Sequence, residues 1–405
     1  MPTLLQINIT ANWGSHGKIA EGIGKEAIAH GWKSYIAYGR WFNPSKSAIY
    51  HIGNNFDEAI HIVGSRLLDN HGLMSSLPTK KLISFIENIK PDIIHLHNIH
   101  GYYLNYSILF DYLAKINIPV VWTLHDCWTF TGHCAHYMFI GCDKWQTHCN
   151  DCPLKSNYPR SIWKDNSDRN FELKRKKFLS VKNLTLVPVS KWLEGDLKKS
   201  FFKNANIHHF YNGINTDIFQ PSENASFIVK QKYNIPSDNK IILGVASNWY
   251  RKGLHDFISL RTKLDMSYTI ILVGLTPKVI KTLPSGIIGI QRTENINELV
   301  NLYSAANVYF NPTWEDNFPT TNIEAMSCGT PVVVYNTGGC AETINKSTGI
   351  VVDKGNLVEA KKHIMEICSN DFGELSEACR QNVVDNYKEE TCYNNYLRLY
   401  NSLVK

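Results

Sequence analysis

Residues 311–342 include the side chains best suited to chemistry. A polar loop after an apolar strand contains Glu315 and Asp316, and Glu324 follows in a predicted helix that begins near Pro319. Proline has the fixed φ angle of a first helical turn. A strand, loop and helix in this order place carboxylates, backbone N–H groups and a helix N-terminus at one edge of a sheet. This arrangement suits a ligand that carries both phosphate and sugar hydroxyls.

Two cations could act on such a phosphate. Arg251 and Lys252 lie between a predicted strand and the start of a predicted helix. Positive charges near a helix start would offset the negative charge that builds on a departing nucleotide. The alternative interpretation is a solvated basic pair.

Two further candidates lie in the first half of the chain. Gly14 and Gly17 form a tight loop before a predicted helix, and His125 follows an apolar strand. Each signal is weak alone, because a glycine pair before a helix is often only a turn. A single histidine is usually structural.

These residues must be positioned by alternating strands and helices. The predicted strands cover residues 4–9, 34–38, 92–97, 119–124, 184–189, 207–211, 240–245, 268–273, 286–290, 308–310, 332–335 and 349–352. Such alternation indicates parallel sheets covered on both faces. The two series predict two α/β, doubly wound domains, 1–211 and 212–388, and a helix over 389–405 that packs back on the first.

Composition limits the class of protein. The chain has 405 residues, of which 43% are apolar and 19% charged, with a net charge of +6. This charge suits phosphate-bearing ligands or an anionic membrane surface, although an ordinary solvated surface is the simpler explanation. No run approaches the ~18 apolar residues of a membrane span. We expect a cytoplasmic protein, and any contact that it makes with the inner face of the cytoplasmic membrane would be peripheral. The basic stretch 171–177 faces either lipid or solvent.

The segment over 311–342 resembles the nucleotide-sugar site of family 4 retaining glycosyltransferases. These enzymes have the GT-B fold, in which two Rossmann-like domains face a cleft, and the resemblance extends over nearly the whole chain. Their motif is two acids separated by seven residues, the second followed by Ala-x-x-x-Gly-x-Pro-Val-Val. The second acid here is Glu324 and the first is Asp316. The resemblance implies that Glu324 binds the ribose hydroxyls and that Asp316 contacts the donor sugar near the reacting carbon.

The sequence departs from the family pattern at two places. The first acid is usually Glu, and Glu315 lies beside Asp316, so either could contact the sugar; the spacing favours Asp316. Pro319 stands where the family usually offers a glycine N–H, which removes one backbone donor. The other donor-binding positions expected in this loop are Asn317, Phe318 and Thr320.

The same resemblance assigns roles to the remaining candidates. Lys252 matches a family lysine on the donor diphosphate, whereas the family's arginine position holds Ser247 and Arg251 adjoins the lysine. The loop from Gly14 to Gly17 would approach the donor phosphate and the acceptor. His125 would contact the donor sugar near the reacting centre.

Residues 127–168 interrupt the alternation and are rich in cysteine. Four thiols are spaced C-x7-C-x6-C-x2-C, at Cys134, Cys142, Cys149 and Cys152. Four thiolates can form a closed tetrahedral zinc site, and in a reducing compartment a metal is favoured over disulfides. Disulfides and packed thiols are the alternatives. Cys127, His133, His136 and His148 are alternative ligands.

The resemblance implies a retaining hexosyltransferase that uses a nucleotide-diphosphate sugar without a catalytic metal. Its acceptor would be a saccharide, lipid-linked, in O-antigen, capsule or exopolysaccharide assembly, and no nucleic acid partner is expected. The N-terminal domain would bind the acceptor and the C-terminal domain the donor. A nucleotide-sugar epimerase or sugar phosphorylase of the same fold, or a non-catalytic sugar-binding protein, is the alternative.

Overall fold

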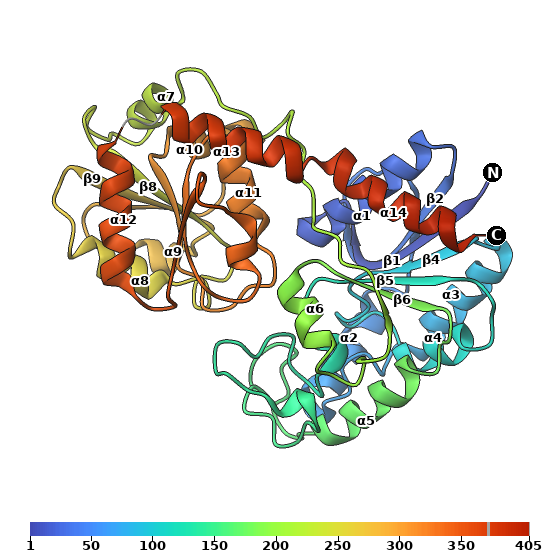
Figure 1. Ribbon diagram of the computed structural model, residues 1–405. Helices are drawn as coiled ribbons and strands as arrows, with labels where there is room; N and C mark the ends of the chain where they lie inside the picture. Colours follow the sequence, from blue (N-terminus) through green and yellow to red (C-terminus); the bar gives the residue numbers. More distant parts are fainter. Residues whose placement is uncertain (371–372, 405) are drawn as a thin grey trace. The chain divides into compact units, whose positions relative to one another are not determined.

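The computed structural model describes residues 1–370 and 373–404, which form two compact units. Unit 1 comprises residues 1–212 together with the C-terminal residues from Glu390 on, and unit 2 comprises residues 213–389. Each unit has one sheet in which all neighbouring strands pair in parallel, with helices on both faces (Figure 1). These are the two doubly wound α/β domains that the alternating sequence predicts.

The sheet of unit 1 has the order β3-β2-β1-β4-β5-β6-β7. Its strands are β1 (Thr3–Ala11), β2 (Lys33–Phe42), β3 (Ala48–His51), β4 (Ile93–Leu96), β5 (Val120–Leu124), β6 (Leu184–Pro188) and β7 (Asn206–Ile207). The strand order reverses between β1 and β4. Ligands of open α/β sheets bind outside the carboxyl ends of the strands at such a switch point.

Helices cover both faces of this sheet. They are α1 (Gly14–Ala29), α2 (Asn55–Leu68), α3 (Ser76–Ile89), α4 (Tyr106–Leu113), α5 (Ser167–Phe178), α6 (Lys191–Leu197) and the C-terminal α14 (Glu389–Leu403). Helices α1 and α14 share one apolar core, in which Ile23, Tyr396 and Tyr400 pack with Val121 of the sheet. The tail therefore folds back on unit 1, because its aromatic residues recur at helical spacing and need a partner face.

The sheet of unit 2 has the order β10-β9-β8-β11-β12-β13. Its strands are β8 (Lys240–Val245), β9 (Tyr268–Val273), β10 (Ile287–Ile290), β11 (Val308–Asn311), β12 (Val332–Tyr335) and β13 (Gly349–Val352). Its helices are α7 (Ala225–Lys232), α8 (Leu254–Arg261), α9 (Pro277–Ile280), α10 (Ile296–Ala305), α11 (Thr320–Ser327), α12 (Leu357–Ser369) and α13 (Gly373–Asn386). The order reverses between β8 and β11, so the loops after these two strands meet at one edge.

Three local details differ from the sequence prediction. Strand β3 was not expected, because its four residues have little burial and only edge pairing. Helix α1 begins at Gly14, so the predicted glycine loop is the first turn of the helix. Pro319 is the N-cap of α11 rather than a residue of its first turn. Among the described residues, no helix is long and apolar enough to span a membrane.

Candidate functional site

The switch point of unit 2 brings the predicted cations and acids into direct pairs. Nη1 of Arg251 lies 2.6 Å from Oε1 of Glu315, and Nζ of Lys252 pairs with Oδ2 of Asp316. The Glu315 side chain is only 4% exposed, whereas that of Asp316 is 19% exposed. The backbone N–H of Trp314 also donates to the carbonyl of Arg251 at 2.9 Å, which ties the two loops together. Glu315 is therefore held in a buried ion pair, and Asp316 is the more accessible carboxylate.

Glu324 is positioned by a tyrosine that the sequence did not single out. The hydroxyl of Tyr303, on α10, donates to Oε2 of Glu324 at 2.9 Å. Burial, together with the nearby Glu324 carboxylate, holds the pKa of Tyr303 well above its usual value. The phenol therefore stays protonated and remains a hydrogen-bond donor to Glu324.

A second buried phenol, that of Tyr309, lies near both predicted acids, Glu324 and Asp316. Burial is the largest cause that raises the pKa of Tyr309, and the charges of Glu324 and Asp316 raise it further. Both carboxylates therefore lie near the same side chain of β11. Burial is the main cause that raises the pKa of the Cys340 thiol beyond β12; the charge of Asp316 raises it further, and that of Lys252 lowers it. The predicted acids and lysine thus belong to one neighbourhood.

The start of α11 is fixed by buried amides. Nδ2 of Asn311 donates to Oδ1 of Asn322 at 2.8 Å, and Nδ2 of Asn322 donates to Oγ1 of Thr343 at 2.9 Å. Pro319 offers no side-chain cap to the helix. Backbone N–H groups at a helix start that its N-cap side chain does not satisfy can bind phosphate.

The switch point of unit 1 has a chain of hydrogen bonds that ends at His125. Nε2 of Gln6 donates to the carbonyl of Ala20 at 2.7 Å, so Oε1 of Gln6 faces Nε2 of His97 at 2.9 Å. Nδ1 of His97 lies 3.2 Å from Nε2 of His125. An amide oxygen only accepts, so His97 carries its proton on Nε2 and accepts at Nδ1. His125 then carries its proton on Nε2, and its Nδ1 is left as an acceptor.

This assignment requires neutral imidazoles, and burial provides them. Burial lowers the pKa of both His97 and His125 well below the usual value, and neighbouring histidines lower it further. The chain Gln6–His97–His125 thus presents a neutral histidine whose Nδ1 can accept a hydrogen bond from a hydroxyl.

The first turn of α1 lies beside this histidine. A Cβ on Gly17 would lie 2.5 Å from Oγ1 of Thr10, so only glycine fits there without displacing the threonine. The ring centroids of His16 and His125 are 6.1 Å apart. Burial lowers the pKa of His16 to about 4. Among the described residues, Nδ1 of His16 has no hydrogen-bond partner. Gly14 has a φ of 65°.

The predicted zinc site is not supported. The four thiols Cys134, Cys142, Cys149 and Cys152 line one cavity of about 10 Å³ and are not in disulfides. Across residues 1–370 and 373–404, however, no three His, Cys, Asp or Glu side chains are placed as a metal-ligand group. Cys134 and Cys152 are hydrogen-bonded to each other instead. Burial lowers the pKa of the nearby Lys174 to about 7, and charges on Cys134 and Cys149 raise it.

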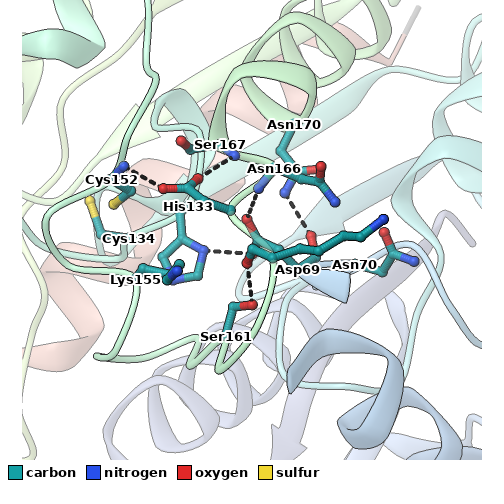
Figure 2. Close-up of polar contacts among 12 residues, drawn as sticks. Asp69, Asn70, His133, Cys134, Cys152, Lys155, Ser161, Asn166, Ser167 and Asn170 are labelled. Carbon is teal, nitrogen blue, oxygen red and sulfur yellow. Dashed lines mark hydrogen bonds and ion pairs between the residues drawn. The ribbon is translucent and has the colours of Figure 1, made fainter. Parts of the chain in front are cut away.

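Polar contacts hold the irregular segment to its neighbours. Figure 2 shows Asp69, the residue that ends α2, at the centre of these contacts. Its carboxylate accepts from Nδ1 of His133 at 2.6 Å and from the backbone N–H of Asn166 at 2.9 Å. Its carbonyl accepts from Nδ2 of Asn170 at 2.8 Å. One buried aspartate therefore joins α2, the cysteine-rich loop and the start of α5.

Models of two protein families match the chain. The model described as Glycosyltransferase Family 4 matches residues 20–218, and the model described as Glycosyl transferases group 1 matches residues 226–385. Together they cover both units. The chain belongs to glycosyltransferase family 4.

Curated relatives of this family 4 protein are named as glycosyltransferases. It is 28% identical over 169 residues to the putative colanic acid biosynthesis glycosyl transferase WcaC of Escherichia coli K12, covering 38% of this chain and 40% of WcaC. It is 26% identical over 206 residues to the N,N'-diacetylbacillosaminyl-diphospho-undecaprenol alpha-1,3-N-acetylgalactosaminyltransferase of Campylobacter jejuni, covering 48% and 53%. The chain thus spans about half the length of the curated relatives it matches.

Solved structures share the whole fold. Sucrose-phosphate synthase from Thermosynechococcus elongatus has a TM-score of 0.75 and 17% identity, over 100% of this chain and 99% of that one. HepE of Anabaena, in complex with UDP-glucose, has a TM-score of 0.66 and 12% identity, over 98% and 99%. At these identities the likeness establishes the GT-B fold of the glycosyltransferase alone.

Several positioning residues of this glycosyltransferase were missed from the sequence. They are Gln6, His16, His97 and Tyr303. Gln6 and Tyr303 lie within apolar patterns that read as core, and their partners are 91 and 21 residues away. His97 lies at the end of the predicted strand over residues 92–97, where a histidine is usually structural. Only the strand order of the sheet brings it between Gln6 and His125.

Proposed function

We propose that the protein is a retaining glycosyltransferase that moves a hexose from a nucleotide-diphosphate sugar to a saccharide hydroxyl. One observation carries the proposal: Lys252 pairs with the accessible Asp316 at the switch point of unit 2, where Tyr303 also orients Glu324. A cation for the diphosphate and two carboxylates for hydroxyls are what a nucleotide sugar requires. The HepE complexes with UDP and UDP-glucose support this class of donor.

The donor-site roles follow from accessibility and charge. Glu324 would accept hydrogen bonds from the ribose hydroxyls, and Asp316 from the sugar. Lys252 and Arg251, which are 22% and 27% exposed, would turn toward the arriving diphosphate and stabilise the charge that develops when it leaves. The uncapped start of α11, with Asn317, Phe318 and Thr320, would line the rest of this site.

Unit 1 would contribute the acceptor-binding side of the reaction. His125 would accept a hydrogen bond from a donor-sugar hydroxyl at Nδ1. Gly14 and Gly17 would let the backbone of the first turn of α1 approach the donor phosphate and the acceptor. The bond between the anomeric carbon and the diphosphate oxygen breaks, the acceptor oxygen bonds to that carbon on the same face, and a donor phosphate oxygen takes the acceptor proton. No divalent metal is required in this scheme.

We place the reaction in bacterial surface-polysaccharide assembly on a lipid-linked acceptor. The colanic acid relative supports the pathway class, and the diphospho-undecaprenol in the name of the Campylobacter relative supports the lipid. The site would then work in the cytoplasm, where nucleotide sugars are available, at the inner face of the membrane.

A donor screen followed by one substitution tests this proposal. Nucleotide sugars are compared by thermal shift, since a ligand at 100 times its dissociation constant adds about 2.7 kcal/mol to stability. With the best donor and an acceptor extract, Glu324→Gln should lower kcat/KM by roughly 30- to 1,000-fold, which is about 2–4 kcal/mol. Glu366→Gln, on the exposed surface of α12, is the matched control.

The screen also separates the rival activities. Epimerisation of the donor without an acceptor would indicate a nucleotide-sugar epimerase. Binding of a donor without any transfer would indicate a sugar-binding protein. Equal turnover of Glu324→Gln and the wild-type protein would overturn the assigned site.

A further inference from the structure

Helix α2 of unit 1 has apolar side chains on its exposed side and small or polar residues on its buried side. Its exposed side has Phe56, Ile60, Val63 and Leu67, with exposed fractions of 72%, 45%, 55% and 44%. These residues follow one another at intervals of four, three and four, which places them in one stripe along the helix. The residues that α2 buries are His61, Gly64 and Ser65. Soluble helices normally place such an apolar stripe against the core.

Contacts of the buried side fix the rotation of α2 about its axis, so the apolar stripe cannot turn toward the core. Nε2 of His61 accepts from the backbone N–H of Gly72 at 3.0 Å, and Nδ1 of His61 lies 2.8 Å from Oγ of Ser75. A Cβ on Gly64 would lie 3.1 Å from the Met74 side chain. The small and polar residues are therefore fitted to their neighbours, and the outward stripe is part of the folded state.

A second segment extends the stripe. The backbone N–H of Ile162 donates to the carbonyl of Arg66 at 2.7 Å, and that of Lys164 donates to the carbonyl of Leu67 at 3.2 Å. Ile162 and Trp163 are 58% and 69% exposed. Just after this segment, the backbone N–H of Asn166 donates to Asp69 at the end of α2 (Figure 2). We call the set Phe56, Ile60, Val63, Leu67, Ile162 and Trp163 the α2 face.

The charges around the α2 face are mainly uncompensated cations. Arg66, Arg160 and Lys164 are exposed, and none makes an ion pair with any residue in the described part of the chain. The acids of α2 are already engaged: Glu58 pairs with Arg40, and Asp57 caps the helix through the backbone N–H of Asn54. An anionic surface would complement this edge.

We propose that the α2 face lies flat in the interface of an anionic lipid bilayer. Helix α2 has 14 residues and is about 21 Å long at 1.5 Å per residue, so its stripe can lie along a surface. An apolar helix face with a tryptophan at the boundary and cations beside it is the composition of interfacial helices. The inference deepens the proposed function, because it would bring unit 1 to a membrane that holds a lipid-linked acceptor.

Vesicle binding of the full chain tests the proposal without any substrate. The protein is sedimented with vesicles of phosphatidylcholine alone and with vesicles that contain phosphatidylglycerol. We expect binding to the anionic vesicles, weakened at least tenfold in the double variant Ile60→Ser with Val63→Ser. The variant Arg66→Gln with Lys164→Gln should lose the preference for anionic lipid. Phe227→Ser, which removes a side chain 68% exposed in unit 2, is the matched control and should bind as the wild type does.

Three results would overturn the proposal. The first is that the wild-type protein fails to sediment with anionic vesicles, and the second is that the double variant of α2 binds as strongly as the control. The third is that the protein is a dimer in solution and that the double variant is a monomer. The last result would assign the α2 face to a second copy. Because no donor or acceptor is present, failure here leaves the transferase test unaffected, and near-ultraviolet circular dichroism confirms that each variant is folded.

Discussion

Replacing Gln6 tests whether a buried chain of hydrogen bonds determines which nitrogen of His125 carries the proton. In the wild-type protein, Gln6 accepts from Nε2 of His97 at 2.9 Å, and Nδ1 of His97 faces Nε2 of His125 at 3.2 Å. Gln6→Met keeps the approximate volume but removes the acceptor. His97 can then move its proton to Nδ1 and donate to His125, which forces the proton of His125 onto Nδ1. The nitrogen offered to the ligand changes from acceptor to donor.

The magnitude follows from burial. Gln6 is fully buried, and removing its amide leaves either an unpaired N–H on His97 or an exchanged tautomer. We expect unfolding free energy to fall by about 1–3 kcal/mol. If His125 accepts from a sugar hydroxyl, loss of that bond should lower kcat/KM by roughly 10- to 100-fold, equal to about 1.4–2.7 kcal/mol.

The assay is nitrogen-15 NMR of the histidine rings, in which protonated and bare nitrogens have separate shifts. We expect His97 and His125 to be protonated at Nε2 in the wild-type protein and to change together in Gln6→Met. Thr185→Val, which removes a buried acceptor for Asn206 elsewhere in the same sheet, should alter neither ring. A wild-type His97 protonated at Nδ1, or a variant with unchanged tautomers, would refute the reasoning.

Three further predictions follow from single contacts. Tyr303→Phe should raise the dissociation constant of the donor nucleotide about tenfold by isothermal calorimetry, because Glu324 loses its orienting bond, and an unchanged constant would argue against that role. Gly17→Ala should lower the melting temperature and the activity, since its Cβ would lie 2.5 Å from Thr10, and a wild-type melting curve would contradict this. Burial lowers the pKa of His61 to about 3, so the folded state favours the neutral ring. The free energy of unfolding that this ring contributes is therefore complete above pH 6.5. It is lost as the pH falls toward 3, by about 5 kcal/mol in total. Urea titrations from pH 7 to pH 4 should show this slope, and His61→Gln should reduce it.

Much of the fold could be predicted because its signals are local. Strands such as Val120–Leu124 and Val332–Tyr335 are short apolar runs, and the helices between them have a period near 3.6. The motif around Glu324 is also continuous in the chain. The short edge strand Ala48–His51 was missed for the converse reason, because it has little burial and no apolar run.

The cysteine-rich segment shows where a local pattern is insufficient. The spacing of its four thiols is compatible with zinc, with disulfides and with packed thiols. The environment of those thiols also includes the buried Lys174, from a helix that begins at Ser167. No spacing rule among cysteines includes a lysine 22 residues beyond the last of them.

The sequence by itself determined two parallel α/β units, the family and the residue types at the proposed donor site, because periodicity and contiguous motifs can be recognised without a structure. Only the tertiary structure decided that Arg251 neutralises Glu315, that Gln6 sets the tautomer of His97, and that α2 turns its apolar stripe outward. The partners in the first two contacts lie 64 and 91 residues apart and meet only because strand order places their loops at one sheet edge. For α2, the contacts of His61 and Gly64 with the residues beneath them determine which side of the helix is buried. The helical period of the sequence does not contain this information.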